Sequence, residues 1–367
     1  TGVMTPLLLT SIMTLVPASR RGAMMGLISV VMSVAPVLGP LVGGLIINAL
    51  PWSALFLIVL PLGVVALLLG VWRMVNVTET ARVPVDVLSV VLSILAFGWL
   101  VYGLSTLGDQ VADHEQSPPW ATLALGLAAL GAFVWRQLVL QRTDAALIDL
   151  RIFTSSAFSW AVLTMVVMNA ILFGTLTLLP FYIQEGLGAN ALESGLLVMP
   201  GGLLMGLAGP VVGALYDRVG PRPLVIPGAF VAAGALWLMA YLLTPDASKW
   251  TVLVLYMVLC AGLALLFSPL FTVAMAGVAP RFTTYASAGI GTVQQIAGAL
   301  GTSVFMVIYS LGRGVVPDGQ APAPEAVAAG THGALIAAAG AAIAIVVLAF
   351  FIRRPGASAA PAAVHLG

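Results

Sequence analysis

TVLVLYMVLCAGLALLFSPLFTVAM, residues 251–275, runs for 25 positions without a charged side chain. A helix that crosses the hydrocarbon core of a bilayer needs about 20 mostly apolar residues, and this run exceeds that length. A strand is disfavoured here, because a membrane strand is shorter and alternates apolar with polar residues. The stretch therefore predicts a transmembrane helix, and the same test along the rest of the chain decides the fold class.

The overall composition also indicates a membrane protein. Of the 367 residues, 61% are hydrophobic and only 7% are charged, whereas a soluble domain carries about a quarter charged residues. The mean hydropathy of +1.11 leaves too little polar surface to cover a water-soluble core. The net charge is +1, and no basic patch is long enough to follow a nucleic-acid backbone. We predict an all-α membrane protein.

Apolar runs of similar length recur along the chain, and short polar connectors with turn-forming pairs such as Pro-Asp and Gly-Pro separate them. A shorter apolar run lies at 3–17. Together the runs predict about eleven transmembrane helices. The ten full-length runs lie near residues 22–47, 52–74, 86–106, 120–140, 157–183, 192–215, 222–243, 251–275, 284–311 and 332–352.

The basic residues predict an orientation for these helices. Cytoplasmic connectors of membrane proteins carry an excess of Lys and Arg. If the connector that holds Arg20 and Arg21 is cytoplasmic, strict alternation leaves only Lys249 and Arg313 outside. The remaining 12 of the 14 basic residues (14 minus 2) then lie inside. We therefore expect a multi-pass protein of the cell membrane with a cytoplasmic C-terminus.

Two segments resemble each other and predict a duplicated architecture. Residues 5–17 read TPLLLTSIMTLVP and residues 268–280 read SPLFTVAMAGVAP, with proline second and last in both. Transporters often carry duplicated halves. Three apolar runs of the second half precede the later copy and none precedes the earlier one, so the first half is expected to lack about three helices. The expected organisation is a remnant of an N-terminal bundle at 1–78, two linker helices at 79–150, a six-helix bundle at 151–356 and a cytoplasmic tail at 357–367.

The first motif is APVLGPLVGG, residues 35–44. Gly39 and Gly43 form a GxxxG face that lets a second helix approach closely. Pro36 and Pro40 each remove a backbone donor and favour a kink. A bent helix with a bare face suits a surface that opens and closes against a neighbour, while ordinary tight packing is the alternative explanation.

The second motif is GALYDRVGPRP, residues 213–223, in an expected cytoplasmic connector. Its glycines, Gly213 and Gly220, permit a tight turn. Asp217, Arg218 and Arg222 can pair with one another or with nearby helix ends. Such a charged latch would hold a transporter closed on the inside. A topology anchor is the alternative reading of its arginines.

Taken together, these motifs resemble the major facilitator superfamily, in its fourteen-helix drug:proton antiporter branch. The sequence TVQQIAGALGTSV at 292–304 is similar to the lincomycin-exporter type within that branch. The resemblance implies eleven of fourteen helices, export of drugs or other amphipathic molecules in exchange for protons, and neither cofactor nor metal. By matching position, the antiporter motif falls on Gly39, Pro40, Gly43 and Gly44, and the gating loop on Gly213, Asp217, Arg218, Gly220 and Arg222.

This chain also departs from the pattern of the branch. The full loop motif and an acidic coupling residue usually lie in the first helices of that branch, which are not in this chain. Pro221 and Pro223 stand where basic residues are common, so the latch is expected to be weaker.

Polar groups within or beside the apolar runs are the remaining candidates for a transport site. Uncharged polar side chains in a dry bundle need partners, and those expected to line a substrate cavity are Asn169, Gln184, Gln294 and Gln295. Packing alone is an equal explanation for them. Glu185 and Glu193 flank an expected external connector and are candidates for proton coupling. Solvated loop charge is the alternative for both.

Other functional classes lack their signatures. An ATP-driven transporter needs a GxxxxGK[ST] loop, and the single lysine, Lys249, is followed by Trp250. Neither HExxH nor GxSxG occurs, so no enzyme is expected. A non-transporting remnant, and an exporter of one specific metabolite or lipid-like compound, stay as alternatives to the drug exporter.

Overall fold

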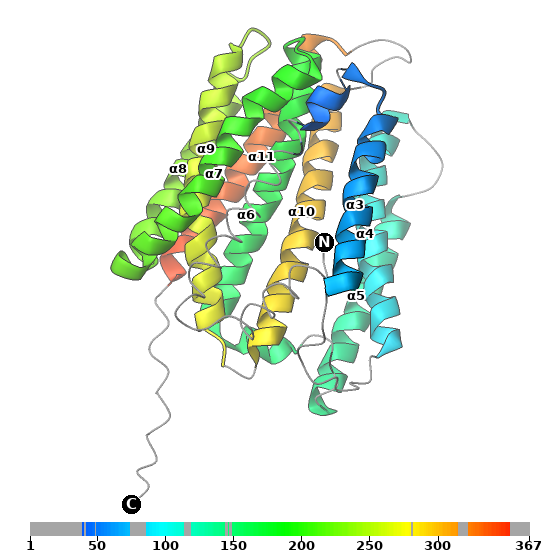
Figure 1. Cartoon of the computed structure of the whole chain (residues 1–367), viewed down its shortest axis with the longest axis vertical. Coiled ribbons are helices and arrows are strands. Elements are labelled where there is room, and N and C mark those ends of the chain that lie inside the picture. Colours follow the sequence, from blue (N-terminus) through cyan, green and yellow to red (C-terminus); the bar gives the residue numbers. More distant parts are fainter. Residues whose placement is uncertain are drawn as a thin grey trace, which may run out of the picture.

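The chain is described by a computed structural model, which covers residues 39, 42–47, 49–73, 86–113, 119–143, 146, 149–279, 282–314 and 322–352. Within these ranges the regular structure is helical and no strand occurs. The helices stand side by side as an elongated bundle (Figure 1). The predicted all-α membrane class is confirmed.

Nine of the described helices are long and apolar enough to cross a membrane. They match nine of the expected runs. The run at 3–17 lies outside the described residues, and of the run at 22–47 only Gly39 and residues 42–47 are described, as helix. The nine are α3 (Ser53–Arg73), α4 (Val87–Asp113), α5 (Pro119–Leu140), α6 (Ser156–Phe181), α7 (Ala191–Val219), α8 (Arg222–Leu242), α9 (Lys249–Ala276), α10 (Thr283–Arg313) and α11 (Pro324–Phe351).

Short polar residues begin several of these helices. The side chains of Ser155, Asn190 and Ser248 accept hydrogen bonds from the first free backbone N–H groups of α6, α7 and α9, as N-terminal caps do. Gly220 follows the last residue of α7 as its C-terminal cap, and its φ of 83° is strained for residues with a side chain. Three short non-α segments complete the described regular structure, two 3-10 turns (Gln141–Thr143 and Leu150–Thr154) and a π-helical turn (Tyr182–Gly186).

The core lies among the six helices α6 to α11. α6 packs against α9, α10 and α11, and α9 packs against α7 and α8. Small residues allow the backbones to touch: a Cβ on Gly301 of α10 would lie 2.4 Å from the Ala170 backbone of α6, and one on Gly262 of α9 would lie 2.6 Å from the Ala232 nitrogen of α8. Such close approach through glycine is characteristic of membrane helix pairs.

A second group of helices lies beside this bundle. α4 and α5 pack on each other, and α4 packs on α10 (right side of Figure 1). Arg136 of α5 binds Asp86 at the start of α4 through two hydrogen bonds of 2.6 and 2.7 Å. The buried Gln137 donates to the buried Ser89 at 2.9 Å. The side chains of α3 are almost all exposed among the described residues.

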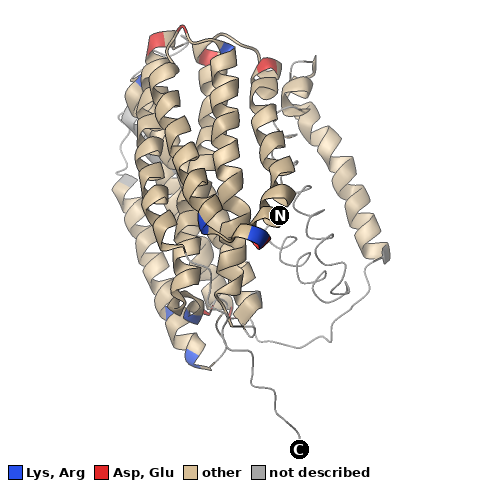
Figure 2. Cartoon of the chain, turned by 90° about the vertical axis from the view of Figure 1, so that its left-hand side faces the viewer, with Lys and Arg blue, Asp and Glu red and all other residues tan. Residues whose placement is uncertain are grey.

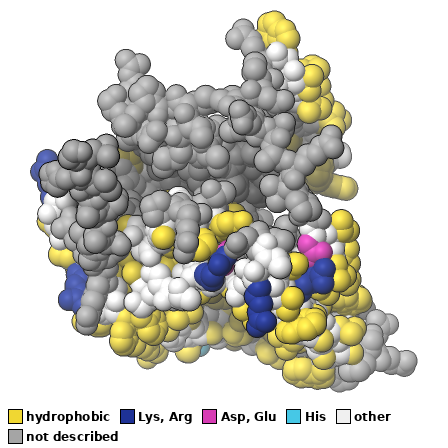
Figure 3. All heavy atoms as spheres, turned by 90° about the horizontal axis from the view of Figure 1, so that it is seen from below, with side chains coloured by type: hydrophobic (Ala, Val, Ile, Leu, Met, Phe, Trp, Pro, Cys, Tyr) yellow, Lys and Arg dark blue, Asp and Glu magenta, His cyan; other side chains and the backbone are white. Residues whose placement is uncertain are grey.

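Charged residues gather at or near helix ends, as Figure 2 shows. Glu185, Glu193, Lys249 and Arg313 lie at one end of the bundle, where α6 and α10 end and α7 and α9 begin. Arg222 lies at the opposite end, where α8 begins. In the view of that lower face, basic side chains are spread among apolar ones (Figure 3). The described charges therefore agree with the predicted map of connectors.

Candidate functional site

Two predicted residues, Gln184 and Glu185, lie together in the π-helical turn that follows α6. Wide turns of this kind appear often at functional sites. The turn is anchored on one side, because the Tyr182 hydroxyl donates to the Thr244 carbonyl at 2.6 Å. Gly188, with φ of 63°, follows in a conformation that favours glycine. The local backbone thus holds an amide and a carboxylate side by side at one end of the bundle.

Glu185 meets two residues of the last turns of α10. The Tyr309 hydroxyl donates to Glu185 Oε2 at 3.2 Å, and Arg313 Nη1 lies 3.8 Å from the same oxygen. The Arg313 guanidinium also lies over the Tyr309 ring, 5.6 Å from its centroid. The side chains of Arg313 and Glu185 are 28% and 33% exposed. Because Arg313 is only loosely placed and water has partial access, Glu185 can exchange its contact with Arg313 for a contact with water or a ligand.

A cavity of about 280 Å³ adjoins this carboxylate. It is lined by Pro180, Phe181, Gln184 and Glu185. The Phe181 and Tyr309 rings lie beside each other, with centroids 6.1 Å apart. Apolar walls with a few converging polar groups are the usual form of a small-molecule site. The cavity offers aromatic surface, an amide and a carboxylate to the same ligand.

The second predicted carboxylate has a different environment. Glu193 binds Lys249 at 2.7 Å and so connects the first turn of α7 with the first turn of α9. Its backbone N–H also bonds to the side chain of the capping Asn190 at 2.8 Å. Both ionic side chains are nearly half exposed, where an ion pair contributes only about 0–1 kcal/mol. This geometry favours a helix-to-helix link over a cavity carboxylate.

The polar residues within the helices do not join the Gln184 cavity. Asn169 is 3% exposed, and its Nδ2 donates to the Met165 carbonyl of its own helix at 2.8 Å. The adjacent glutamines of α10 differ, since Gln295 is exposed and Gln294 is half-buried. Gln294 Nε2 is buried and has no hydrogen-bond partner among the described residues. Gln294 Nε2 is therefore a buried donor within the bundle that a ligand would satisfy.

The glycines of the antiporter motif contribute unequally to packing. Pro40 lies outside the described residues. A Cβ on Gly39 or Gly43 would meet no described atom within 4 Å, whereas a Cβ on Gly44 would lie 2.6 Å from the Ala191 carbonyl oxygen. The close approach between helical residues 42–47 and the start of α7 thus depends on Gly44 and not on the GxxxG pair.

The predicted gating loop joins two helix ends. Arg222 Nε donates to the Ile352 carbonyl at 3.1 Å, at the C-terminal end of α11, a position that favours a cation. A Cβ on Gly213 would lie 3.5 Å from the Ser268 hydroxyl of α9, an ordinary contact distance. Asp217 and Arg218 are exposed, and Asp217 makes no ion pair within the described part of the chain. Arg222 therefore meets a helix end, one of the two predicted outcomes, and the described contacts form no Asp–Arg latch.

The sequence alone did not reveal the partners of the two glutamates. Its charge map left only Lys249 and Arg313 on the outer side, and these are the two cations that pair with Glu193 and Glu185. These two basic residues are the exceptions to the positive-inside bias, and their position on the outer side could have predicted that they pair with the two glutamates. Tyr309 carried no comparable signal, because a single tyrosine in an apolar helix is common.

Comparison with known proteins places these features in a family. The family model described as "Major Facilitator Superfamily" matches residues 1–302. The lincomycin resistance protein LmrB of Listeria monocytogenes is 35% identical over 326 residues, which cover 89% of this chain and 68% of that protein. LmrB of Bacillus subtilis is 34% identical over 360 residues, 96% and 74% of the two chains. A multidrug resistance protein B homolog of Mycobacterium tuberculosis is 31% identical over 313 residues, 84% and 57%.

Proposed function

Because the chain belongs to the Major Facilitator Superfamily, we propose that it exports drugs or other amphipathic small molecules in exchange for protons. Membership makes the chain a multi-pass membrane transporter and not an enzyme. The choice of drugs as substrates rests on the relatives that carry lincomycin or multidrug resistance in their names.

The observation that carries the proton coupling is the contact of Glu185 with Arg313 and Tyr309 beside a cavity. Ionisable groups are costly near a membrane interior and usually mark a pathway. When Glu185 is ionised, Arg313 neutralises it. When Glu185 is protonated, the attraction to Arg313 is lost, and this contact between the turn after α6 and the end of α10 is weakened. Proton binding would thus be linked to opening of the cavity, as alternating access requires.

The other predicted residues take supporting roles in this proposal. We assign the antiporter motif, Gly39, Pro40, Gly43 and Gly44, to a surface that opens and closes between the part of the chain at 1–78 and the bundle of residues 151–356; the described contact of that surface is at Gly44. Arg222 and its loop act at the opposite end of that bundle. Gln294 and Asn169, inside the bundle, are assigned to the path of the substrate, and residues 79–150 serve as linker helices.

A proton-flux assay on the full-length protein in everted membrane vesicles tests the proposal. Addition of lincomycin or ethidium to energised vesicles should release protons from the lumen in the wild type. Glu185→Gln should reduce this drug-induced flux by at least about tenfold, because an amide cannot bind and release a proton. Glu193→Gln serves as the matched control and should retain most of the flux, since its carboxylate pairs with Lys249 away from the cavity.

Two results would contradict different parts of the proposal. Drug export that continues after a protonophore collapses the gradient would exclude proton antiport. Normal coupling in Glu185→Gln, together with a loss in Glu193→Gln, would move the proton site to the α7–α9 link.

A further inference from the structure

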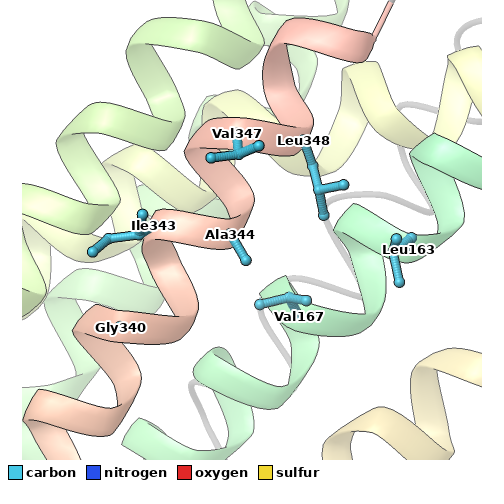
Figure 4. A pocket seen from close by; sticks show the side chains of 7 residues that line it. All are labelled: Leu163, Val167, Gly340, Ile343, Ala344, Val347 and Leu348. Carbon is cyan, nitrogen blue, oxygen red and sulfur yellow. The ribbon is translucent and has the colours of Figure 1, made fainter.

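An apolar groove runs between α6 and α11, outside the Glu185 site. Its volume is about 550 Å³. Figure 4 shows Leu163 and Val167 on α6 facing the turns of α11 that carry Ala344 and Leu348. All the described residues that line the groove are apolar, and all lie within the membrane-spanning parts of the two helices. The groove therefore faces the hydrocarbon region of the bilayer.

The length of the groove matches one leaflet. Its α11 side extends from Gly340 to Leu348, which is about 12 Å at 1.5 Å per residue. One leaflet contributes about 15 Å to the hydrocarbon core. Beyond Leu348, toward the C-terminal end of α11, the Trp160 and Phe351 rings stack with centroids 4.9 Å apart. Tryptophan is enriched at the membrane interface, so the groove runs from the interface toward the bilayer centre.

The walls of the groove are open to a flexible apolar occupant. Leu163, Ile343 and Val347 are 45%, 49% and 52% exposed. The far end is formed by Gly340, where a Cβ would meet no described atom within 4 Å. Because glycine has no side chain, an elongated apolar ligand has room to continue past Ile343. No wall residue offers a hydrogen bond, so the occupant recognised here is a hydrocarbon chain.

Charge at the interface end indicates what the hydrocarbon is attached to. The exposed Arg222 donates to the carbonyls of Ile352 and Phe350 at the end of α11, and Arg353 and Arg354 follow directly in the sequence. A basic residue at the membrane interface attracts the phosphates of lipid headgroups. We propose that the α6–α11 groove binds one acyl chain of a phospholipid, with its phosphate beside Arg222. The binding test of this site does not require transport activity.

Native mass spectrometry of the full-length protein tests the site. The delipidated protein is titrated with phosphatidylglycerol, and Gly340→Leu is compared with Gly234→Leu. Gly234 is an equally open, exposed glycine on α8, so both variants add the same side chain to a helix surface. Gly340→Leu should weaken the tightest phospholipid-binding step by at least about tenfold, a change of about 1.4 kcal/mol. Gly234→Leu should bind as the wild type does.

Crosslinking with a photoreactive phosphatidylglycerol that carries a diazirine in its acyl chain locates the bound lipid on the protein. Crosslinks are expected on the peptide that holds Ile343 and Val347, and they should disappear in Gly340→Leu. Equal lipid binding by both variants, without crosslinks on α11, would overturn the proposal. A dimer that Gly340→Leu dissociates would also overturn it, because the groove would then be an interface between copies of the chain. Matching thermal unfolding of the two variants establishes that both are folded.

Discussion

At the scale of single residues, Gly44 differs from the glycines that surround it. Its backbone approaches Ala191 so closely that a Cβ would lie 2.6 Å from the carbonyl oxygen, whereas a Cβ on Gly43 would meet no described atom within 4 Å. The motif pattern alone favours Gly39 and Gly43, because a spacing of four places them on one face. Which glycine makes the contact depends on how the neighbouring helix is placed, and the pattern does not contain that information.

We therefore expect Gly44→Val and Gly43→Val to differ. Gly44→Val forces the two backbones apart, and overpacking of this kind costs about 1–3 kcal/mol. It should lower the thermal unfolding temperature and reduce drug export, while Gly43→Val should unfold as the wild type does. The measurement is thermal unfolding in detergent alongside drug accumulation in cells. If Gly43→Val alone stops export without loss of stability, the GxxxG face closes against a neighbour in another state of the transport cycle.

The placement of neighbouring helices, which the sequence does not contain, also explains why Glu185 and Glu193 were both predicted as proton-coupling candidates and could not be distinguished. Both stand beside an expected external connector, and the sequence gives them equal weight. The structure separates them through Arg313 and Lys249, which come from α10 and α9. Membrane helices are apolar on every side, so their sequence does not reveal which faces meet. Pairings between distant helices therefore stay hidden while the helices themselves are easily found.

At the scale of secondary structure, the length of the apolar runs was sufficient to place nine helices, because the bilayer sets a minimum span. Asp86 caps the start of α4, because the Ser89 N–H bonds to Asp86 Oδ2 at 3.1 Å. Its bidentate contact with Arg136, 50 residues later, was not predicted. The π-helical turn at Tyr182–Gly186 was missed as well, since no residue pattern distinguishes it from the end of an α-helix.

The α4–α5 hairpin should depend on this contact in a pH-dependent way. Hydrogen bonds from Arg136, and then from Ser89, hold the pKa of Asp86 well below its usual range. A lowered pKa in the folded state gives stability that is present above the unfolded pKa of about 3.9 and is lost as the pH falls through the folded pKa. Asp86→Asn should therefore lower the unfolding temperature by a similar amount at pH 8 and pH 5.

Asp246→Asn is the matched control for this variant. Asp246 is exposed in the α8–α9 connector and makes no ion pair within the described part of the chain. The unfolding temperature of Asp246→Asn should equal that of the wild type at both pH values. The wild type should approach Asp86→Asn only below about pH 4. A difference between wild type and Asp86→Asn that already vanishes near pH 6 would show that Asp86 is not held ionised by Arg136.

At the scale of the whole molecule, function depends on which end of the bundle faces the cytoplasm. The charge bias predicts that the Glu185 cavity lies outside and the Arg222 loop lies inside. Two exposed aspartates mark these ends, Asp246 before α9 and Asp217 at the end of α7. The 21 residues of α8 lie between their connectors, which corresponds to about 30 Å. One pair of cysteine substitutions can thus determine the orientation.

In a Cys260→Ala background, which removes the single native cysteine, a membrane-impermeant maleimide applied to intact cells should label Asp246→Cys and not Asp217→Cys. Everted vesicles should give the reverse, and permeabilised cells should label both. This outcome would place Glu185 where an exporter meets the more acidic medium, so that protons enter from the side to which drugs are released. The opposite labelling would put the same carboxylate on the cytoplasmic side, and its proposed role as the outer proton acceptor would have to be abandoned even if drug export itself were intact.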